Sequence, residues 1–162
     1  MTYFYRSLIG LFASSLIACG GAAPELVLAQ ADFPTFQSQV YPVLLRDCSF
    51  FACHGSSERF FQVYGPGRAR LDPMADPLAE ATMDEIIQSY NRALSMIDVQ
   101  DPMRSLLLRK PLALSAGGSG HEGVDAWMRD VYSSKQDPSY AALEAWVLSA
   151  TAALPAPTGA TP

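Results

Sequence analysis

The apolar residues of this chain recur at the spacing of helices. In Phe33–Leu44, apolar side chains return every three or four residues, although Pro42 must kink or restart the helix. A second helix begins at Thr82, which forms a capping box with Glu85. Its expected apolar face consists of Ile86, Ile87, Tyr90, Leu94 and Ile97. No segment shows the sustained alternation that is typical of a strand.

Two Asp-Pro pairs predict the starts of two further helices, each with an N-cap followed by a proline at the first helical position. Asp101-Pro102 opens a short helix through Leu106–Lys110, which ends before Pro111. Asp137-Pro138 opens a longer helix over Ser139–Ala150. The residues that it is expected to bury are Tyr140, Leu143, Trp146 and Val147.

The segments Phe60–Ala79 and Ala116–Gly123 resist regular structure because glycine and proline interrupt them. Four modest helices joined by long loops give a thin core for a chain of this length. A large apolar prosthetic group would help to fill such an interior.

The N-terminus predicts a targeting segment. Leu8–Ala18 is apolar but too short to span a bilayer, and Leu16-Ile17-Ala18-Cys19 is similar to a bacterial lipobox. We therefore expect residues 1–18 to be a lipoprotein signal peptide and Cys19 to be acylated; the alternative is an ordinary signal peptide with a cysteine near its cleavage site. By composition, residues 19–31 are a flexible tether, 32–154 one domain and 155–162 a disordered proline-rich tail.

Charge argues against nucleic acid as a partner. Residues 1–18 contain one basic residue, Arg6, and no acid, so the remainder carries 10 basic and 16 acidic residues, a net charge of −6. A nucleic-acid surface would need a basic patch, and the sequence shows none.

Cys48-Ser49-Phe50-Phe51-Ala52-Cys53-His54-Gly55 carries the clearest chemical signal. Two thiols followed directly by histidine are typical of covalent haem attachment, where the usual spacing is Cys-x-x-Cys-His and the histidine ligates the iron. Here four residues separate the cysteines. Two other interpretations stay open, namely a disulfide that closes a small loop and a pair of zinc thiolates. If Cys19 carries lipid, Cys48 and Cys53 are the remaining cysteines and face an oxidising compartment, which disfavours a cytosolic metal site.

The mature domain has one other histidine, His121, in a loop with four glycines over Gly117–Gly123. Glycines let a backbone approach a bulky group, so His121 is a candidate second axial ligand; alternatively it is an ordinary exposed loop residue. Methionine is the rival ligand. Met103 and Met128 are the candidates, whereas Met83 and Met96 are more typical of core positions.

Motifs along the domain resemble those of class I c-type cytochromes. The segment from Phe36 to Gly55 is similar to the Val-x-Pro-Ile-Leu…Cys…Cys-His-Gly opening of planctomycete and myxobacterial cytochrome-c-like domains. Ser105–Pro111, the Gly117–Gly123 loop and the Tyr140, Leu143, Trp146, Val147 helix resemble their later motifs in order and spacing. The resemblance covers about Phe33 to Ala150.

This resemblance implies an all-α, small cytochrome c-like domain with long loops around one covalent haem c, attached at Cys48 and Cys53 and ligated by His54. It implies a membrane-tethered electron carrier, rather than an enzyme, that exchanges electrons with redox proteins at the periplasmic face or the outer membrane. The alternatives are a haem-free, disulfide-closed lipoprotein that acts as an interaction module, and a haem enzyme of the peroxidase or gas-binding kind. For the enzyme, Glu122 is the nearest acid–base candidate.

Overall fold

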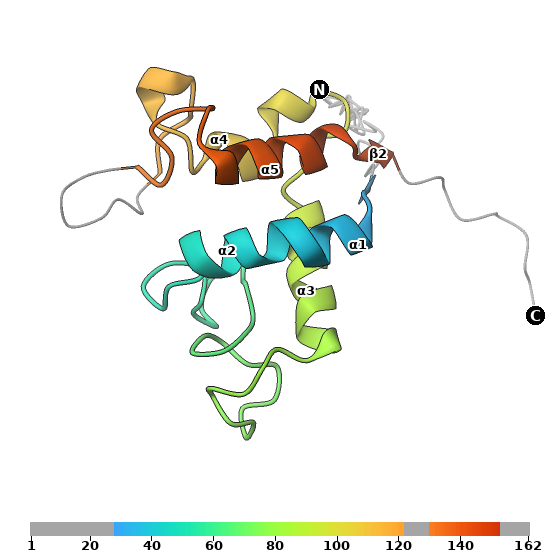
Figure 1. Cartoon of the computed structure of the whole chain (residues 1–162), viewed down its shortest axis with the longest axis vertical. Helices are drawn as coiled ribbons and strands as arrows, with labels where there is room; N and C mark the ends of the chain where they lie inside the picture. Colours follow the sequence, from blue (N-terminus) through green and yellow to red (C-terminus); the bar gives the residue numbers. More distant parts are fainter. Residues whose placement is uncertain (1–27, 122–129, 153–162) are drawn as a thin grey trace, which may run out of the picture.

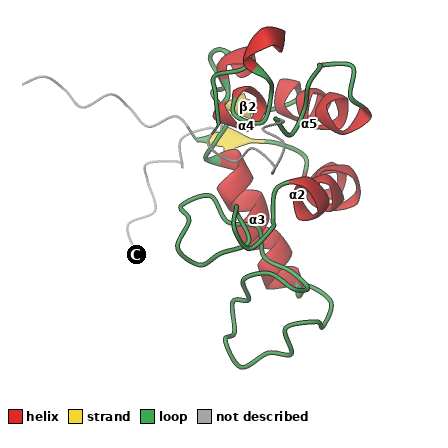
Figure 2. Ribbon diagram, turned by 90° about the vertical axis from the view of Figure 1, so that its left-hand side faces the viewer, coloured by secondary structure: helices red, strands yellow, loops and turns green. Residues whose placement is uncertain are grey.

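The computed structural model describes residues 28–121 and 130–152. Two helical layers lie side by side in Figure 1, with α5 above the rod made by α1 and α2, and α3 runs away from the rod across its lower side. Figure 2, turned by 90°, shows the α2 rod and α5 close to end-on, with α3 crossing beneath them. The N-terminal rod therefore contacts both α5 and α3.

The rod consists of α1 (Phe33–Thr35), the π-helical turn η1 (Phe36–Val40) and α2 (Tyr41–Asp47). Pro42 explains the change of helix type. A proline has no N–H to donate into a helix, and Pro42 lies in the first turn of α2, where such a hydrogen bond is not needed. The N–H of the preceding Tyr41 donates to the carbonyl of Phe36, five residues earlier, which is the hydrogen bond of a π-helix. The predicted interruption at Pro42 is thus confirmed as a restart within one continuous rod.

Helix α3 (Met83–Leu94) begins with the predicted capping box of Thr82 and Glu85. Its predicted apolar face is confirmed only in part. The residues that it buries fully are Glu85, Ser89 and Ala93, whereas Ile87 is exposed. The inward face is centred on polar and small side chains because a long loop, not an apolar layer, packs against this end of the helix.

The second half of the chain builds the other layer. The 3-10 turn η2 (Pro102–Arg104) leads into α4 (Leu106–Arg109), and the 3-10 turn η3 (Leu114–Ala116) follows. The predicted cap at Asp101 is wrong: its side chain caps nothing, and Asp98 instead accepts from the amides of Gln100 and Asp101 at 3.0 and 3.1 Å. That contact forms a tighter turn before the short helix.

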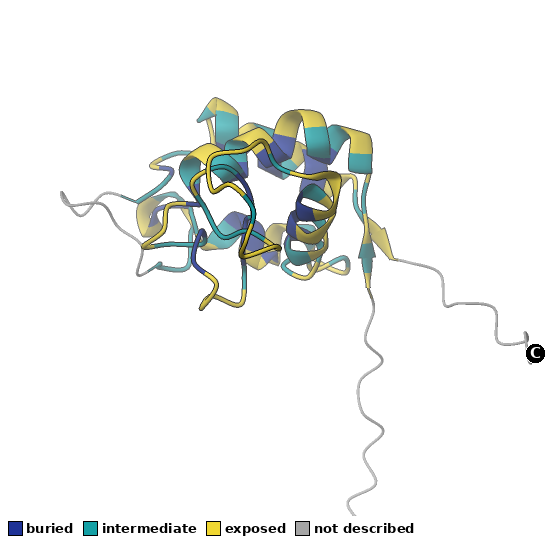
Figure 3. Ribbon diagram, turned by 90° about the horizontal axis from the view of Figure 1, so that it is seen from below, coloured by how far each residue is buried: buried dark blue, intermediate teal, exposed yellow. Residues whose placement is uncertain are grey.

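Helix α5 (Pro138–Leu148) matches its prediction closely. Asp137 accepts from the amides of Ser139 and Tyr140, as an N-cap does. The buried residues of α5 are those that the sequence predicted, namely Tyr140, Leu143, Trp146 and Val147. They pack against the apolar side of the N-terminal rod, where the Phe36 and Trp146 ring centroids are 5.2 Å apart. Figure 3 shows buried residues on the inner sides of the helices and exposed residues along the loops.

The two ends of the described chain meet. Strand β1 (Ala29–Gln30) pairs antiparallel with β2 (Thr151–Ala152). Hydrogen bonds continue this closure into the domain, because the Tyr90 hydroxyl donates to the Ala31 carbonyl and Trp146 Nε1 to the Asp32 carbonyl. Residues 29–31, which composition assigned to the tether, therefore contact the domain. Within the described residues, no helix has the length and apolar character needed to cross a bilayer.

The long loop between α2 and α3 is fixed by one arginine. All five N–H groups of Arg70 donate, two to the Glu85 carboxylate and three to the carbonyls of Asp76, Ala79 and Glu80. The side chains of Arg70 and Glu85 are 6 % and 2 % exposed. Burial by itself raises the pKa of Glu85, but hydrogen bonds from Arg70, Thr82 and Leu71 outweigh it, so the pKa is lowered.

Replacing Glu85 should loosen this loop. Glu85→Ala leaves a buried guanidinium without its carboxylate and removes the capping box, so we expect the free energy of unfolding to fall by about 3 kcal/mol in urea denaturation. The difference in the free energy of unfolding between the wild type and Glu85→Ala should be complete above pH 4.5, the ordinary pKa of the carboxyl. It should be lost as the pH falls through the lowered pKa that Glu85 has in the folded protein. The matched control is Asp84→Ala, an exposed acid in the same helical turn, with an expected loss below about 1 kcal/mol. Equal losses in the two variants would contradict the role of the ion pair.

Candidate functional site

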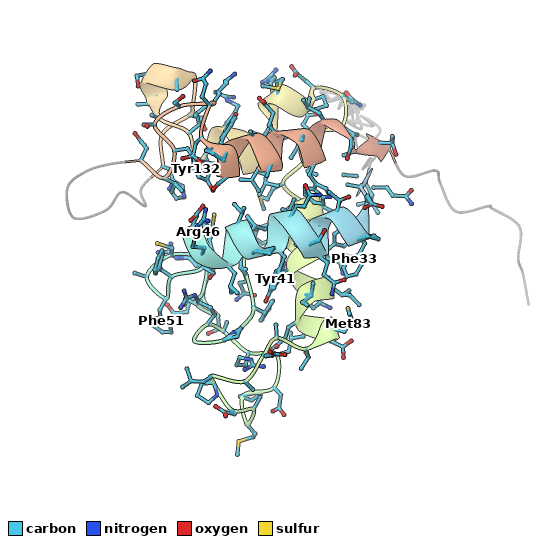
Figure 4. The ribbon with its side chains drawn as sticks, in the orientation of Figure 1. Phe33, Tyr41, Arg46, Phe51, Met83 and Tyr132 are labelled. Carbon is cyan, nitrogen blue, oxygen red and sulfur yellow. The ribbon has the colours of Figure 1, made fainter. Side chains whose placement is uncertain are left out.

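The segment after α2 folds into a loop that brings both cysteines and His54 together. Cys48 continues the last turn of α2 through its N–H to the Leu44 carbonyl. The His54 N–H then donates to the Cys48 carbonyl at 3.1 Å, which closes the loop. Phe50 and Phe51 form the outer part of the loop, with exposed fractions of 53 % and 75 %. The four residues between the cysteines are thus accommodated by an outward turn, and Figure 4 shows Phe51 at the outer edge of the molecule.

Gly55 makes this loop possible. A Cβ atom at position 55 would lie 2.0 Å from the Ser49 carbonyl oxygen and 2.8 Å from Cδ of Arg68. The backbone groups of Gly55 are also used, since its N–H donates to Phe50 and its carbonyl accepts from Ala69. The glycine after Cys53-His54 is therefore required by close packing of the loop on itself.

The His54 ring is oriented by one hydrogen bond. Nδ1 lies 2.9 Å from the Phe61 carbonyl oxygen, which can only accept, so Nδ1 carries the proton. Burial lowers the pKa of His54, and the nearby His121 and Arg59 lower it further against that hydrogen bond, which favours the neutral ring. In the neutral ring the lone pair is on Nε2, the form in which histidine binds a metal ion.

His121 lies opposite this ring. The centroids of the His54 and His121 rings are 5.8 Å apart, and the ring planes are inclined by 33°. The preceding Gly120 has φ of +67°, a left-handed conformation that favours glycine, and its carbonyl accepts from Lys110 Nζ at 3.3 Å. The Nδ1 atom of His121 is buried and has no hydrogen-bond partner in the part of the chain that the structure describes. This nitrogen is therefore a candidate ligand atom.

Both thiols are free, Cys48 buried and Cys53 half-buried. Burial, together with the Asp47 charge and Cys53, raises the pKa of the Cys48 thiol to about 12, so it stays protonated near neutral pH. A buried neutral thiol is a poor metal thiolate. Within residues 28–121 and 130–152, no group of three or more His, Cys, Asp or Glu side chains is arranged to hold a metal ion.

A single cavity of about 1510 Å³ is lined by Cys48, Cys53, His54 and His121. It exceeds the roughly 300 to 1,000 Å³ of ordinary small-molecule pockets. Its apolar wall comes from both layers and from the segment just after α3, and includes Leu44, Phe61, Met96, Leu107, Val131 and Leu143. The site is thus a large apolar space with two thiols and two imidazoles on its wall.

A polar network joins the layers beside this cavity. The Arg46 guanidinium makes a two-fold contact with the Asp47 carboxylate and also donates to Ser139 Oγ, while the Tyr132 hydroxyl donates to Asp47 at 2.9 Å. Burial and the neighbouring Cys48 and Asp47 raise the pKa of Tyr132. Figure 4 shows Arg46 and Tyr132 facing each other across the gap between α2 and the upper layer. Sequence reasoning missed this network because 85 positions separate Tyr132 from Asp47.

The methionine candidates have different positions. Met103 is 38 % exposed in η2 and is not part of the cavity wall. Met96, which the sequence assigned to the core, lies on that wall. Met128 and Glu122 lie outside the described residues, as does Cys19. Among the described candidates, His121 is the side chain that lies opposite His54.

Comparisons with protein-family models, with curated proteins and with solved structures find no match to this chain. Its function must therefore be argued from the site itself.

Gly55→Ala tests the packing of the cysteine loop. The added methyl group meets a backbone oxygen that cannot move freely, so we expect a loss of about 1 to 3 kcal/mol in the free energy of unfolding. The control is Ser57→Ala, an exposed position two residues along the same loop, which should change stability by less than about 0.5 kcal/mol. Thermal unfolding of the two variants measures both losses. Equal losses would show that position 55 does not require glycine.

Proposed function

We propose that this chain is a single-haem c-type cytochrome that is tethered to a membrane and carries electrons outside the cytoplasm. The observation that carries the proposal is that Cys48, Cys53, His54 and His121, which the sequence singled out as haem-binding candidates, all line one large apolar cavity. Cys48 and Cys53 would attach the haem through thioether bonds, and His54 would be one axial ligand. His121 would be the other.

The residues present fit such a group. Imidazole nitrogens lie about 2.0 to 2.1 Å from a bound metal ion, so two rings on opposite sides of one ion have centroids roughly 6 Å apart. The His54 and His121 centroids are separated by 5.8 Å. His54 is held as the Nδ1–H form by the Phe61 carbonyl, and Nδ1 of His121, which has no hydrogen-bond partner within the described residues, would be available as a second ligand atom. Arg59 and Lys110 on the cavity wall would offer cations to the acidic groups of the cofactor.

When bound, haem supplies one-electron redox chemistry at its iron, and the protein sets the potential through ligand identity and burial. The chain's own contribution is then mainly structural. The loop hydrogen bond from His54 to Cys48 fixes the spacing of thiol and imidazole. The apolar part of the cavity wall would contact the haem, and the Phe61 carbonyl keeps the His54 proton on Nδ1, so that the lone pair of Nε2 stays free to bind a metal ion.

Covalent attachment should depend on both thiols. In the wild-type protein we expect a haem stain that survives denaturation and an intact mass increased by one haem. Cys53→Ala and Cys48→Ala should each lose all or most of the stain because one thioether bond is missing. A wild-type mass of the lipidated polypeptide alone, or one reduced by the two hydrogens of a disulfide, would contradict the proposal and favour the haem-free lipoprotein.

The matched control is the third cysteine. Cys19→Ala should keep the covalent haem, since position 19 lies outside the Cys48–His54 motif, but should leave the membrane fraction because the lipid is missing. Retention of this variant in membranes after a high-salt wash would show that the anchor lies elsewhere.

Ligation by His121 can be tested in the same protein. His121→Ala should retain covalent haem but become high-spin and bind carbon monoxide when reduced, because the sixth position opens. The controls are Met96→Leu and Met103→Leu, which should keep the low-spin spectrum of the wild type. A low-spin spectrum of His121→Ala that matches the wild type would assign the position to another ligand. Carbon monoxide binding by the wild-type protein would instead favour the haem enzyme.

A further inference from the structure

The loop before α3 and the first half of that helix expose a group of large apolar side chains. Their exposed fractions run from 37 % to 88 %, and they are Leu71, Met74, Leu78, Met83 and Ile87. Loop tips usually carry small or polar residues, and clusters of exposed apolar residues mark interaction sites. Figure 1 shows the loop extending below α3, away from α5, and Figure 4 shows Met83 at the adjoining end of α3. We call the exposed face of residues 71–87 the loop surface.

Two consecutive turns of the same kind form the tip of this loop. The sequence repeats as Asp72-Pro73-Met74-Ala75 and Asp76-Pro77-Leu78-Ala79. In each turn the aspartate side chain accepts from the amide two residues later, at 2.8 Å from Met74 and 2.9 Å from Leu78. The aspartate carbonyl accepts from the alanine amide at 3.1 Å in both turns. Met74 and Leu78 therefore occupy the same position in two matching turns, exposed by 88 % and 76 %.

The buried ion pair of Arg70 and Glu85 joins the parts of the loop surface. Arg70 donates to three carbonyls within residues 76–80, which surround the second turn. The two oxygens of Glu85 accept from the amide of Leu71 and from that of Thr82, the residue before α3. Both turns and the start of the helix are thus attached to one ion pair. A partner meets a backbone that is already ordered, which reduces the entropy that binding costs.

The loop surface is also acidic. Residues 71–88 contain no lysine or arginine. Asp72, Asp76, Glu80 and Asp84 are exposed, and none of them belongs to an ion pair within the described residues. The remaining acid of this segment, Glu85, is paired with Arg70. Four uncompensated carboxylates therefore lie among the exposed apolar side chains.

These charges select the kind of partner. Apolar surfaces that bind membranes are typically flanked by lysine and arginine, and carboxylates are repelled by anionic lipids. A second copy of this chain carries a net charge of −5 and would be repelled as well. A basic protein segment with apolar side chains fits both properties of the surface, because its cations attract the carboxylates and its apolar groups cover the exposed side chains.

We propose that the loop surface is a docking site for a basic protein segment that carries apolar side chains. Met74 and Leu78 would contact the apolar groups of the partner, and Glu80 and Asp84 would pair with its lysines or arginines. None of residues 71–88 lines the cavity that contains the candidate haem ligands. The inference therefore goes beyond the proposed function, since this docking needs neither haem nor the cavity.

A model peptide tests this chemistry without the natural partner. The Cys19→Ala protein, which lacks the predicted lipid, is titrated with an amphipathic peptide of about fourteen residues made of lysine and leucine. Backbone amide shifts are followed by NMR at about 0.15 M salt, where long-range attraction is screened. We expect saturable shifts centred on residues 71–87. Peptides with glutamate in place of lysine, or serine in place of leucine, should bind about tenfold more weakly. Absent shifts, or shifts centred elsewhere, would overturn the proposal.

A first pair of variants tests the apolar contact. Met74→Ser/Leu78→Ser should weaken binding of the lysine–leucine peptide by about tenfold, because two exposed side chains at the tip are lost. The matched control Leu114→Ser/Leu148→Ser removes two leucines that are exposed by 70 % and 53 % elsewhere, and should stay within about twofold of the wild type. The same spectra report that the variants are folded. Equal effects of the two double variants would contradict the docking site.

A second pair tests the charge. Glu80→Gln/Asp84→Asn should weaken binding by about fivefold at the same salt concentration. The control Glu58→Gln/Asp101→Asn removes two other exposed acids and should stay within about twofold, since those positions lie outside the loop surface. If the control weakens binding as much, net charge alone governs the peptide and the proposal fails.

Two further measurements identify a different occupant. Binding to neutral phosphatidylcholine vesicles that Met74→Ser/Leu78→Ser abolishes, with no peptide shifts at residues 71–87, would assign the surface to a membrane and overturn the proposal. Concentration-dependent dimerisation in sedimentation that the same variant abolishes would assign it to a second copy and overturn the proposal as well. A protein without visible haem absorbance contradicts only the proposed function, and the peptide titration then still decides the loop surface.

Discussion

The candidate site depends on how the N-terminal rod and α5 are held together. At one end they are clamped by packing, where Phe36 meets Trp146 and the indole N–H donates to the Asp32 carbonyl. At the other end the connection is polar, through Arg46, Asp47, Ser139 and Tyr132. The aromatic packing at the first end holds the rod and α5 side by side. The hydrogen bonds at the second end connect them and leave the cavity between them open. The cavity lies at this polar end, where Cys48 leaves α2.

This arrangement separates stability from function within a small domain. The aromatic cluster of Phe33, Phe36, Tyr90 and Trp146 packs near the paired ends of the chain. The opposite half contains long loops that are ordered by directed polar contacts, as at Arg70 and Arg68. Hydrogen-bonded loops can leave an apolar space open, whereas a uniformly packed core would close it.

Local signals predicted the helices because each one is carried by neighbouring residues. The capping box at Thr82 and Glu85, the Asp137 cap and the buried face of α5 were all found in this way. The inward face of α3 was not, because Glu85 and Ser89 are buried through partners in a distant loop, including Arg70 and the Tyr64 amide. The prediction of a cap at Asp101 was wrong for a local reason: the turn before η2 is held by Asp98, which accepts from the amides of Gln100 and Asp101, and the Asp101 side chain makes no capping hydrogen bond. For the site, Cys48, Cys53 and His54 follow from a motif, and His121 from its glycines. The Phe61 carbonyl and the Tyr132 hydroxyl have no sequence signal. The first is a backbone atom, and the second contacts Asp47 only once the chain has folded.

The π-helical turn before Pro42 changes the direction in which the later residues of the rod point. An α-helix advances by 100° per residue, so the one extra residue held in a π turn rotates everything downstream by about that angle relative to the helix before it. Phe36, the first residue of this turn, and Leu44, beyond its end, are both fully buried. The direction in which α2 presents its last residues, and hence the side from which Cys48 enters the cavity, is therefore set eight to twelve positions upstream. A deletion of one residue in Phe36–Val40 would leave the motif Cys48–His54 intact in the sequence and turn it toward a different side of the rod.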